Sequence, residues 1–172
     1  MSDKFTHMDL YAGVGGFTLG FEATGMFETR LLVDSDESAR TTFQRNRPRI
    51  PYWRRDLSDV PAAKLMELAR LAPGELNVLT AGPPCQGLSK IGTRQLDDPR
   101  NRQLKHTAEI IEEIRPHMAI IENVPPLFWD EQSPLFDELS VMLHDAGYDV
   151  NPQILEAWRH GVPQMRRRLI II

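Results

Sequence analysis

The sequence contains one cysteine, no internal repeat, no low-complexity tract and no long uninterrupted apolar run. A single cysteine cannot form a disulfide within the chain, which fits a reducing compartment. The longest apolar runs have the length of strands, too short to cross a bilayer as a helix, and the polar residues 1–7 do not resemble a signal peptide. These features predict a soluble protein of the cytoplasm.

An excess of positive charge is also missing, since the formal net charge is −4. Net charge governs solubility and long-range attraction but does not describe a local site. Arginines are locally dense in two places, and their planar guanidinium groups suit phosphates and base edges. For the first cluster, a solvated surface and a nucleic-acid contact remain equally open. The clusters are Arg45, Arg47, Arg49, Arg54 and Arg55, and then Arg159, Arg166, Arg167 and Arg168.

The length of 172 residues with 41% hydrophobic residues suits one globular domain. Apolar runs alternate with helix-like segments, which predicts βαβ units and a mainly parallel sheet with helices on both faces. We expect strands at 6–11, 31–34, 52–53, 78–81, 118–121, 150–157 and 169–172, the fifth being fully buried. We expect helices at 17–23, 37–46, 61–72, 104–114 and 135–146.

A glycine-rich turn joins the first strand to the first helix, in the segment Asp9-Leu-Tyr-Ala-Gly-Val-Gly-Gly-Phe17. Glycines let a backbone turn tightly and approach a ligand closely. Asp34 follows at the end of the second strand, where a carboxylate can accept hydrogen bonds from both ribose hydroxyls. Asp56 comes after the third strand, near an adenine amino group. Because the glycine pattern differs from G-x-G-x-x-G, a nucleoside cofactor is favoured over a nicotinamide one.

The cysteine lies in a stiff loop, Ala81-Gly-Pro-Pro-Cys-Gln-Gly-Leu-Ser89, directly after a buried strand. The two prolines fix the backbone and remove two amide donors. At the carboxyl edge of a parallel sheet the loop faces the ligand crevice, where the Cys85 thiol is placed for nucleophilic attack. A small buried hydrophobe is the commoner role of a lone cysteine, and the position of this one argues against it.

A carboxylate and a pair of arginines follow at the ends of other strands. Glu122, in Ile120-Ile-Glu-Asn-Val-Pro125, is expected beside the Cys85 loop, where a partly protonated carboxyl could donate to a ring nitrogen; simple capping of the next loop is the alternative. In an extended segment alternate residues share a face, so Arg166 and Arg168 point into one site and Arg167 faces away.

These segments together resemble the DNA (cytosine-5) methyltransferase family. DLYAGVGGF is similar to the family's cofactor turn, GPPCQGLS to its catalytic loop, ENVP to its glutamate motif and GVPQMRRRLIII to its arginine strand. The four occur in the family's order and span nearly the whole chain. The resemblance implies a Rossmann-like fold of S-adenosylmethionine-dependent methyltransferases and a role in DNA methylation, as in restriction-modification systems.

The resemblance also implies a role for each matching residue. S-adenosylmethionine would donate the methyl group to a cytosine flipped out of double-stranded DNA. Cys85 would add to carbon 6 of the ring, Glu122 would bind the ring nitrogen and amino group, and Arg168 with Arg166 would support the other edge. No metal is required. Cofactor contacts would be Tyr11, Gly13, Val14, Gly16, Asp34, Asp56, Leu57, Pro84 and, one residue beyond the family's usual spacing, Leu104.

Members of this family usually continue into a target-recognition domain and then a closing segment. No part of residues 1–172 resembles either of these. We therefore expect a methyltransferase catalytic domain that is truncated or one half of a split enzyme, requiring a second chain or a further C-terminal part. The alternatives are a cofactor-binding module without catalysis and an RNA cytosine methyltransferase of the same family. A nucleotide-binding oxidoreductase is a distant fourth, because it leaves Cys85, Glu122 and the arginines unexplained.

Overall fold

Two compact units make up the chain in the computed structural model, which describes residues 4–84, 101–129 and 134–172. The first unit comprises residues 1–82 and 110–119, and the second comprises residues 83–109 and 120–172. Up to residue 82 the elements are β1 (Phe5–Leu10), α1 (Gly16–Ala23), β2 (Phe27–Asp34), α2 (Glu37–Asn46), β3 (Tyr52–Arg54), α3 (Ala62–Ala69) and β4 (Val78–Ala81). Beyond the loop they are α4 (Asn101–Ile114), β5 (Met118–Asn123), α5 (Pro126–Trp129), α6 (Leu135–Asp145), β6 (Pro152–Glu156), the 3₁₀ turn η2 (Ala157–His160) and β7 (Arg167–Ile171).

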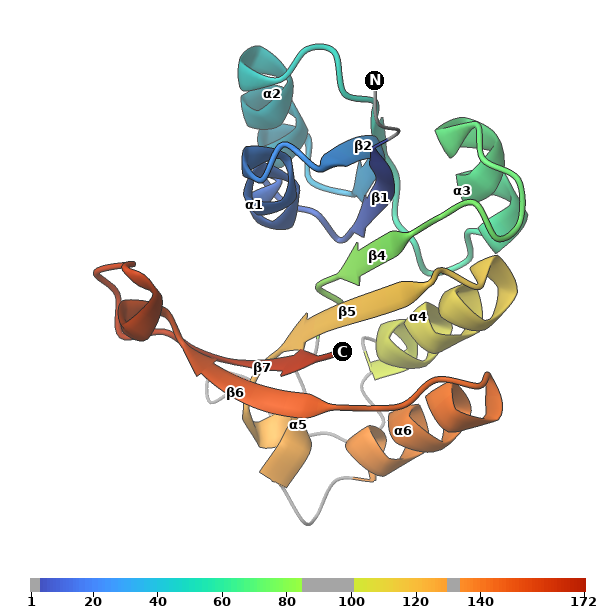
Figure 1. Cartoon of the computed structure of the whole chain (residues 1–172), viewed down its shortest axis with the longest axis vertical. Helices are drawn as coiled ribbons and strands as arrows, with labels where there is room; N and C mark the ends of the chain where they lie inside the picture. Colours follow the sequence, from blue (N-terminus) through green and yellow to red (C-terminus); the bar gives the residue numbers. More distant parts are fainter. Residues whose placement is uncertain (1–3, 85–100, 130–133) are drawn as a thin grey trace. The chain divides into compact units, whose positions relative to one another are not determined.

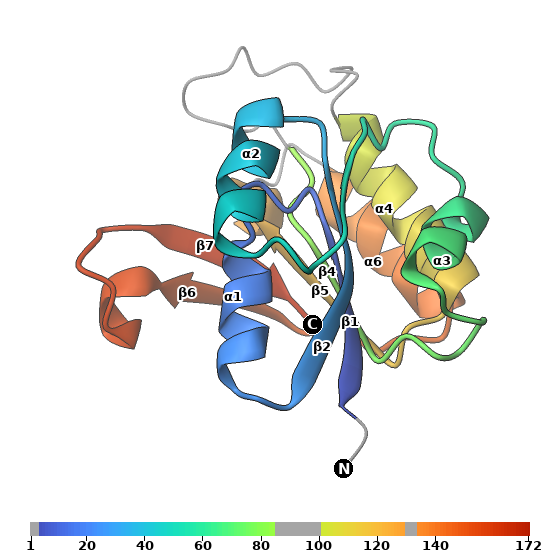
Figure 2. The same cartoon turned by 90° about the horizontal axis from the view of Figure 1, so that it is seen from above.

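The first unit is built on four parallel strands in the order β3-β2-β1-β4. Helices α1 and α2 lie on one face of these strands and α3 on the other (Figure 2). Leu10 on β1, Leu32 on β2 and Leu79 on β4 are completely buried. Because the strands are parallel, their carboxyl ends share one edge, and the glycine turn and Asp34 therefore lie at the same edge.

The second unit contains an antiparallel ladder in which β7 pairs with both β5 and β6. Leu169 and Ile171 on β7 are buried, as are Leu139 and Leu143 on α6. Strands β6 and β7 form a hairpin closed by η2, visible in red and orange in Figure 1. Since β7 runs against β5, its first residues lie beside the carboxyl end of β5.

Most predicted elements are confirmed, and α2 and β4 have the predicted bounds. Helix α2 begins at Glu37 because Asp36 accepts hydrogen bonds from the amides of Ser38 and Ala39, at 2.7 and 3.1 Å. The expected mainly parallel arrangement, with helices on both faces, holds within the first unit. No helix among the described residues has the length and apolar character needed to cross a membrane.

Several predicted boundaries were wrong. Helix α3 ends at Ala69 rather than at residue 72, because Arg70 adopts a left-handed conformation with φ 57° and its amide bonds to the Glu67 carbonyl. Strand β2 begins four residues before Leu31, because Phe27, Glu28 and Thr29 pair with β1. Strand β5 extends to Asn123 and is not fully buried, since Met118 is 45% exposed. Helix α5 and the turn η2 were not predicted.

Candidate active site

The glycine turn between β1 and α1 is held in a left-handed conformation. Tyr11, Gly13 and Gly15 have φ values of 54°, 52° and 81°. A Cβ atom at Gly15 would lie 2.5 Å from ring carbons of Phe43, so this glycine is needed for the packing of α2 against the turn. A Cβ atom at Gly13 or Gly16 would meet nothing within 4 Å. Those two glycines therefore leave open space beside the backbone, as a bound ligand requires.

Asp34, at the end of β2, is tied directly to this turn. Its Oδ2 accepts a hydrogen bond from the Gly13 amide at 2.8 Å, and its Oδ1 accepts one from the Asp36 amide at 2.9 Å. The Tyr52 hydroxyl donates to the Gly13 carbonyl at 2.8 Å. Burial and nearby carboxylates raise the pKa of Tyr52, so its hydroxyl keeps the proton that it donates. Each oxygen of Asp34 retains a lone pair, which suits it to accept from a pair of hydroxyls.

A buried polar network lies beneath the turn. Asp9, 1% exposed, accepts from the Thr18 hydroxyl and amide at 2.8 and 3.3 Å and from the Thr80 hydroxyl at 2.7 Å. His7, completely buried, contacts the Thr80 hydroxyl through Nε2 at 2.9 Å and the Thr29 hydroxyl through Nδ1 at 3.0 Å. Since Thr80 gives its hydrogen to Asp9, Nε2 of His7 is the donor and Nδ1 accepts from Thr29. The network joins β1, β2, β4 and the first turn of α1.

Burial shifts both titrating groups of this network away from their ordinary values. Desolvation raises the pKa of Asp9 to about 6, against the opposing effect of its hydrogen bonds to Thr80 and Thr18. Desolvation lowers the pKa of His7 to about 4. His7 is therefore neutral at pH 7, as the donor and acceptor assignment requires.

The other predicted cofactor residues of the first unit differ in exposure. Val14 is 56% exposed beside the turn, whereas Leu57 is 2% exposed and offers almost no surface to a ligand. Asp56 is exposed after β3, and its Oδ1 accepts from the amide and hydroxyl of Ser58 at 2.9 and 2.6 Å. These bonds lower the pKa of Asp56 and keep its carboxylate ionised.

In the second unit, Glu122 on β5 is held by two arginines from the β7 side. Its Oε1 lies 3.0 Å from Nη2 of Arg166 and 2.8 Å from Nε of Arg168. Glu122 pairs across the ladder with Ile170, so Ile170, Arg168 and Arg166 share its face by alternation. The two guanidinium groups fix the position of the Glu122 side chain through these short contacts.

Arg167 points away from this site, and the predicted alternation is confirmed. It stands opposite Glu156 on β6, with Nε 3.5 Å from Oε1 of that carboxylate. Its guanidinium lies 5.4 Å from the ring centroid of Trp129.

Cys85 lies outside the described residues, but the segment that leads to it is fixed beside Glu122. The side-chain amide of Asn123 donates to the Pro83 carbonyl at 3.1 Å, and Asn123 is 3% exposed. Pro84, in the same segment after β4, is half-buried. Leu104, in α4, is 2% exposed and so contributes no side-chain surface.

Within each unit the predicted residues gather as expected: the glycine turn with Asp34 in the first, and Glu122 with Arg166 and Arg168 in the second. Sequence reasoning missed Tyr52 and the network of His7, Thr18 and Thr80. A polar residue at an inward-facing strand position, such as His7 or Thr80, is the signal that could have revealed it.

Comparisons with known proteins agree with this arrangement. A model of the family described as C-5 cytosine-specific DNA methylase matches residues 5–172. The type II methyltransferase M.XorII of Xanthomonas oryzae is 35% identical over 167 residues, which are 96% of this chain and 39% of that protein. M.AquIA of Picosynechococcus is 32% identical, with 96% of this chain covering 70% of that protein.

Solved structures show the same fold. A putative DNA modification methyltransferase encoded within a prophage of E. coli matches 98% of this chain and 46% of its own, with a TM-score of 0.83 and 28% identity. The predicted methyltransferase fold is thereby confirmed. With the family model extending over nearly every residue, the chain belongs to the C-5 cytosine-specific DNA methylase family.

Proposed function

We propose that the chain is the catalytic and cofactor-binding portion of a methyltransferase that modifies carbon 5 of cytosine in DNA. The observation that carries the proposal is Glu122 held by Arg166 and Arg168, beside the fixed start of the Cys85 loop. A carboxylate, two guanidinium groups and a thiol are the groups needed to bind and activate a pyrimidine ring. A simple nucleotide-binding module would need none of them.

The first unit fits S-adenosylmethionine as the cofactor. Asp34 has lone pairs for two ribose hydroxyls, the open faces of Gly13 and Gly16 leave room for the nucleoside, and exposed Asp56 offers an acceptor for an amino group. Tyr11 and Val14 would add contacts in this unit, with buried Leu57 supporting its neighbours, and the family resemblance adds Pro84 and Leu104 of the second unit. When bound, the cofactor supplies an electrophilic methyl group.

The chemistry then follows from this chain's own residues. The Cys85 thiolate adds to carbon 6 of cytosine, which makes carbon 5 nucleophilic. Both ion pairs of Glu122 within the described residues use Oε1, so Oε2 is available to the amino and ring-nitrogen edge of the base. Arg168, with Arg166, has further donors for the carbonyl oxygen. After methylation, loss of the carbon 5 proton to a base releases Cys85.

The chemistry at Cys85 also requires a part that recognises DNA. The chain spans 39% of the length of M.XorII, so residues 1–172 would supply the chemistry while a part beyond them, or a second chain, reads the DNA sequence. The target cytosine would be flipped out of double-stranded DNA before attack. The expected cellular location is the cytoplasm, where Cys85 stays reduced.

The test is transfer of labelled methyl groups to polynucleotides, followed by digestion to nucleosides and mass spectrometry. Combined with the DNA-reading part or second chain, wild-type residues 1–172 should form 5-methylcytosine in duplex DNA, and Cys85→Ser should form none under the same conditions. Thr24→Ser, which introduces serine at an exposed position just after α1, is the matched control. Product in transfer RNA but not in DNA would establish the RNA-directed alternative, and 5-methylcytosine formation by Cys85→Ser would refute the mechanism.

A further inference from the structure

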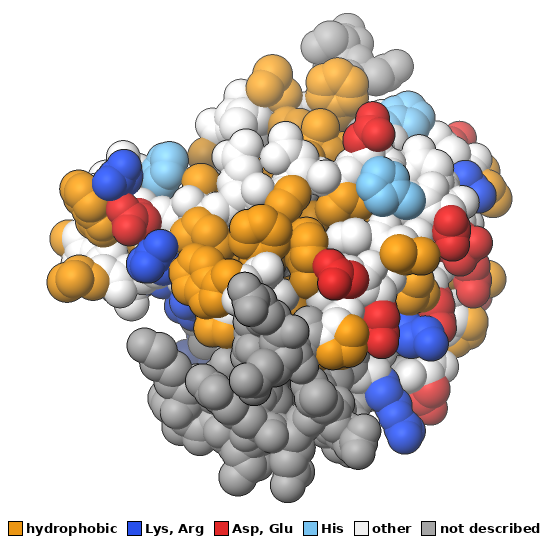
Figure 3. Space-filling view, turned by 90° about the horizontal axis from the view of Figure 1, so that it is seen from below, with side chains coloured by type: hydrophobic (Ala, Val, Ile, Leu, Met, Phe, Trp, Pro, Cys, Tyr) orange, Lys and Arg blue, Asp and Glu red, His pale blue; other side chains and the backbone are white. Residues whose placement is uncertain are grey.

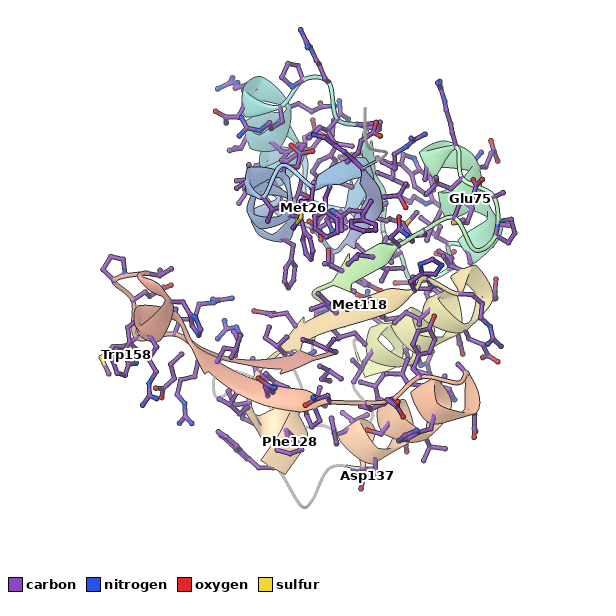
Figure 4. All side chains as sticks on the ribbon, viewed as in Figure 1. Met26, Glu75, Met118, Phe128, Asp137 and Trp158 are labelled. Carbon is purple, nitrogen blue, oxygen red and sulfur yellow. The ribbon has the colours of Figure 1, made fainter. Side chains whose placement is uncertain are left out.

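The β6–β7 hairpin carries cationic groups and a tryptophan beyond the Arg166 and Arg168 that the proposed chemistry uses. Residues 157–168 include four arginines and one histidine and no carboxylate. At the end of this hairpin Trp158 is 54% exposed and Met165 is 98% exposed, and Figure 4 shows Trp158 at its outer end. These two apolar side chains stand close in sequence to the arginines, so the hairpin end offers a partner both apolar and cationic groups.

The turn at the end of the hairpin is an ordered structure. The Ala157 amide donates to the Arg166 carbonyl at 2.8 Å, and the Ala157 carbonyl accepts from the Val162 amide at 3.2 Å. Gly161 closes η2 with φ 81°. Trp158 and Arg159 are therefore presented on a fixed backbone, and binding there would not require the turn to fold first.

The arginines of the hairpin are paired, yet positive charge remains. Glu156 receives Arg159 at 2.7 Å and Arg167 at 3.5 Å, and Glu122 receives the other two. Four guanidinium groups thus face two carboxylates, which leaves two positive charges on the described hairpin and β5. The side chain of Arg159 is 66% exposed and lies 5.0 Å from the Trp158 ring centroid.

These groups also line a hollow on the hairpin. It has a volume of about 420 Å³ and is bounded by Ile154, Leu155, Glu156, Arg159, His160 and Arg167. On the face in Figure 3, Arg or Lys, His and apolar side chains lie together at the hairpin. The hollow is large enough for a phosphodiester group with its sugar, and its two arginines outnumber its one carboxylate, Glu156, which favours an anion.

Position links this surface to the site at Glu122. Arg166, whose side chain contacts Glu122, is joined to the start of η2 by the hydrogen bond from the Ala157 amide to its carbonyl. A base held at Glu122 remains attached to its strand, and a strand that leaves the site on the Arg166 side would pass the end of the hairpin. We infer that the hairpin end, centred on Trp158, Arg159 and His160, binds the phosphate backbone of the DNA strand that carries the target cytosine. This inference rests on the proposed function for its substrate.

Fluorescence anisotropy with a labelled duplex, at several salt concentrations, tests the inference. Arg159→Ala should weaken binding and reduce the slope of log K against log salt concentration by about 0.9 for each phosphate that the arginine neutralises in the wild type. Trp158→Ala should weaken binding about fivefold or more without changing that slope. Lys64→Ala is the matched control, because Lys64 is also an exposed cation paired with a glutamate three residues away.

The side chains of Trp158 and Arg159 are exposed, so Trp158→Ala and Arg159→Ala should have the same midpoint of denaturant unfolding as the wild type. These midpoints are measured before the binding experiments. Binding by Arg159→Ala and Trp158→Ala equal to that of Lys64→Ala, or no duplex binding by the wild type, would overturn the inference. Displacement of DNA by polyglutamate at equal charge concentration would also overturn it, in favour of an acidic protein partner. If the hairpin variants lose DNA binding but no methyl transfer to DNA is detected, the proposed function fails and the backbone contact stands.

Discussion

Asp9→Asn should change how the stability of the chain depends on pH, because Asp9 and His7 titrate in opposite senses in the same buried network. Asp9 has a folded pKa of about 6, raised from 3.8. Its stabilising effect is therefore full below pH 3.8 and is lost as the pH rises through 6. His7 has a folded pKa of about 4, lowered from 6.5. Its stabilising effect is full above pH 6.5 and is lost as the pH falls through 4.

Between pH 4 and 6 the two effects cancel. One proton bound differently by the folded and unfolded chain changes the free energy of unfolding by about 1.4 kcal/mol per pH unit. In this window the folded state binds an extra proton at Asp9 and lacks one at His7. The wild-type curve therefore has no slope from this pair. Asp9→Asn removes one of the two titrations, so its free energy of unfolding should rise with pH, relative to wild type, by about 2–3 kcal/mol across the window.

The assay is urea unfolding at half-unit steps from pH 4 to pH 7. The slope is compared rather than the absolute stability, because asparagine also changes the hydrogen bonds to Thr18 and Thr80. His7→Gln should give a difference of opposite sign, and exposed Asp59→Asn is the control. Curves for Asp9→Asn and wild type that run parallel from pH 4 to 6 would refute the assignment of these titrations.

Three further outcomes are expected. Gly15→Ala should lower the free energy of unfolding by about 2–3 kcal/mol, measured by urea unfolding, because the new Cβ meets Phe43 at 2.5 Å and φ is 81°; an unchanged midpoint would count against this packing. Gly16→Ala, which meets nothing within 4 Å, should leave stability intact but weaken cofactor binding by calorimetry, and unaltered affinity would mean that the open space is not the cofactor's. Asp36→Ala should cost about 1 kcal/mol in the same unfolding assay through loss of the α2 cap, with Ser35→Ala as the neighbouring control that should not.

The residues that carry chemistry could be predicted from sequence because each follows a strand whose apolar run is unmistakable. Asp34 ends β2, and Glu122 lies one residue from the end of β5, so parallel strand direction and alternation suffice to locate them. Alternation also separated Arg167 from Arg166 and Arg168. These are local rules with a period of two residues, and they need no knowledge of distant contacts.

What sequence could not predict depends on contacts far apart in the chain. The bond between Tyr52 and Gly13 joins residues 39 apart, and the Asp9–Thr80 bond joins residues 71 apart. The early end of α3 at Arg70 required a left-handed arginine, which no propensity favours. Strand β2 was predicted too short because its polar first half is stabilised by pairing with β1 rather than by its own composition.

The central claim is that the glycine turn with Asp34 binds S-adenosylmethionine for chemistry at Cys85. Calorimetric titration of the chain with S-adenosylmethionine, alongside Asp34→Ala and the control Asp59→Ala, tests it most directly. The account predicts saturable binding that Asp34→Ala weakens at least about tenfold, through loss of its hydrogen bonds to a ligand, and that Asp59→Ala leaves unchanged. No binding by the wild-type chain, or equal affinity in the two variants, would contradict it.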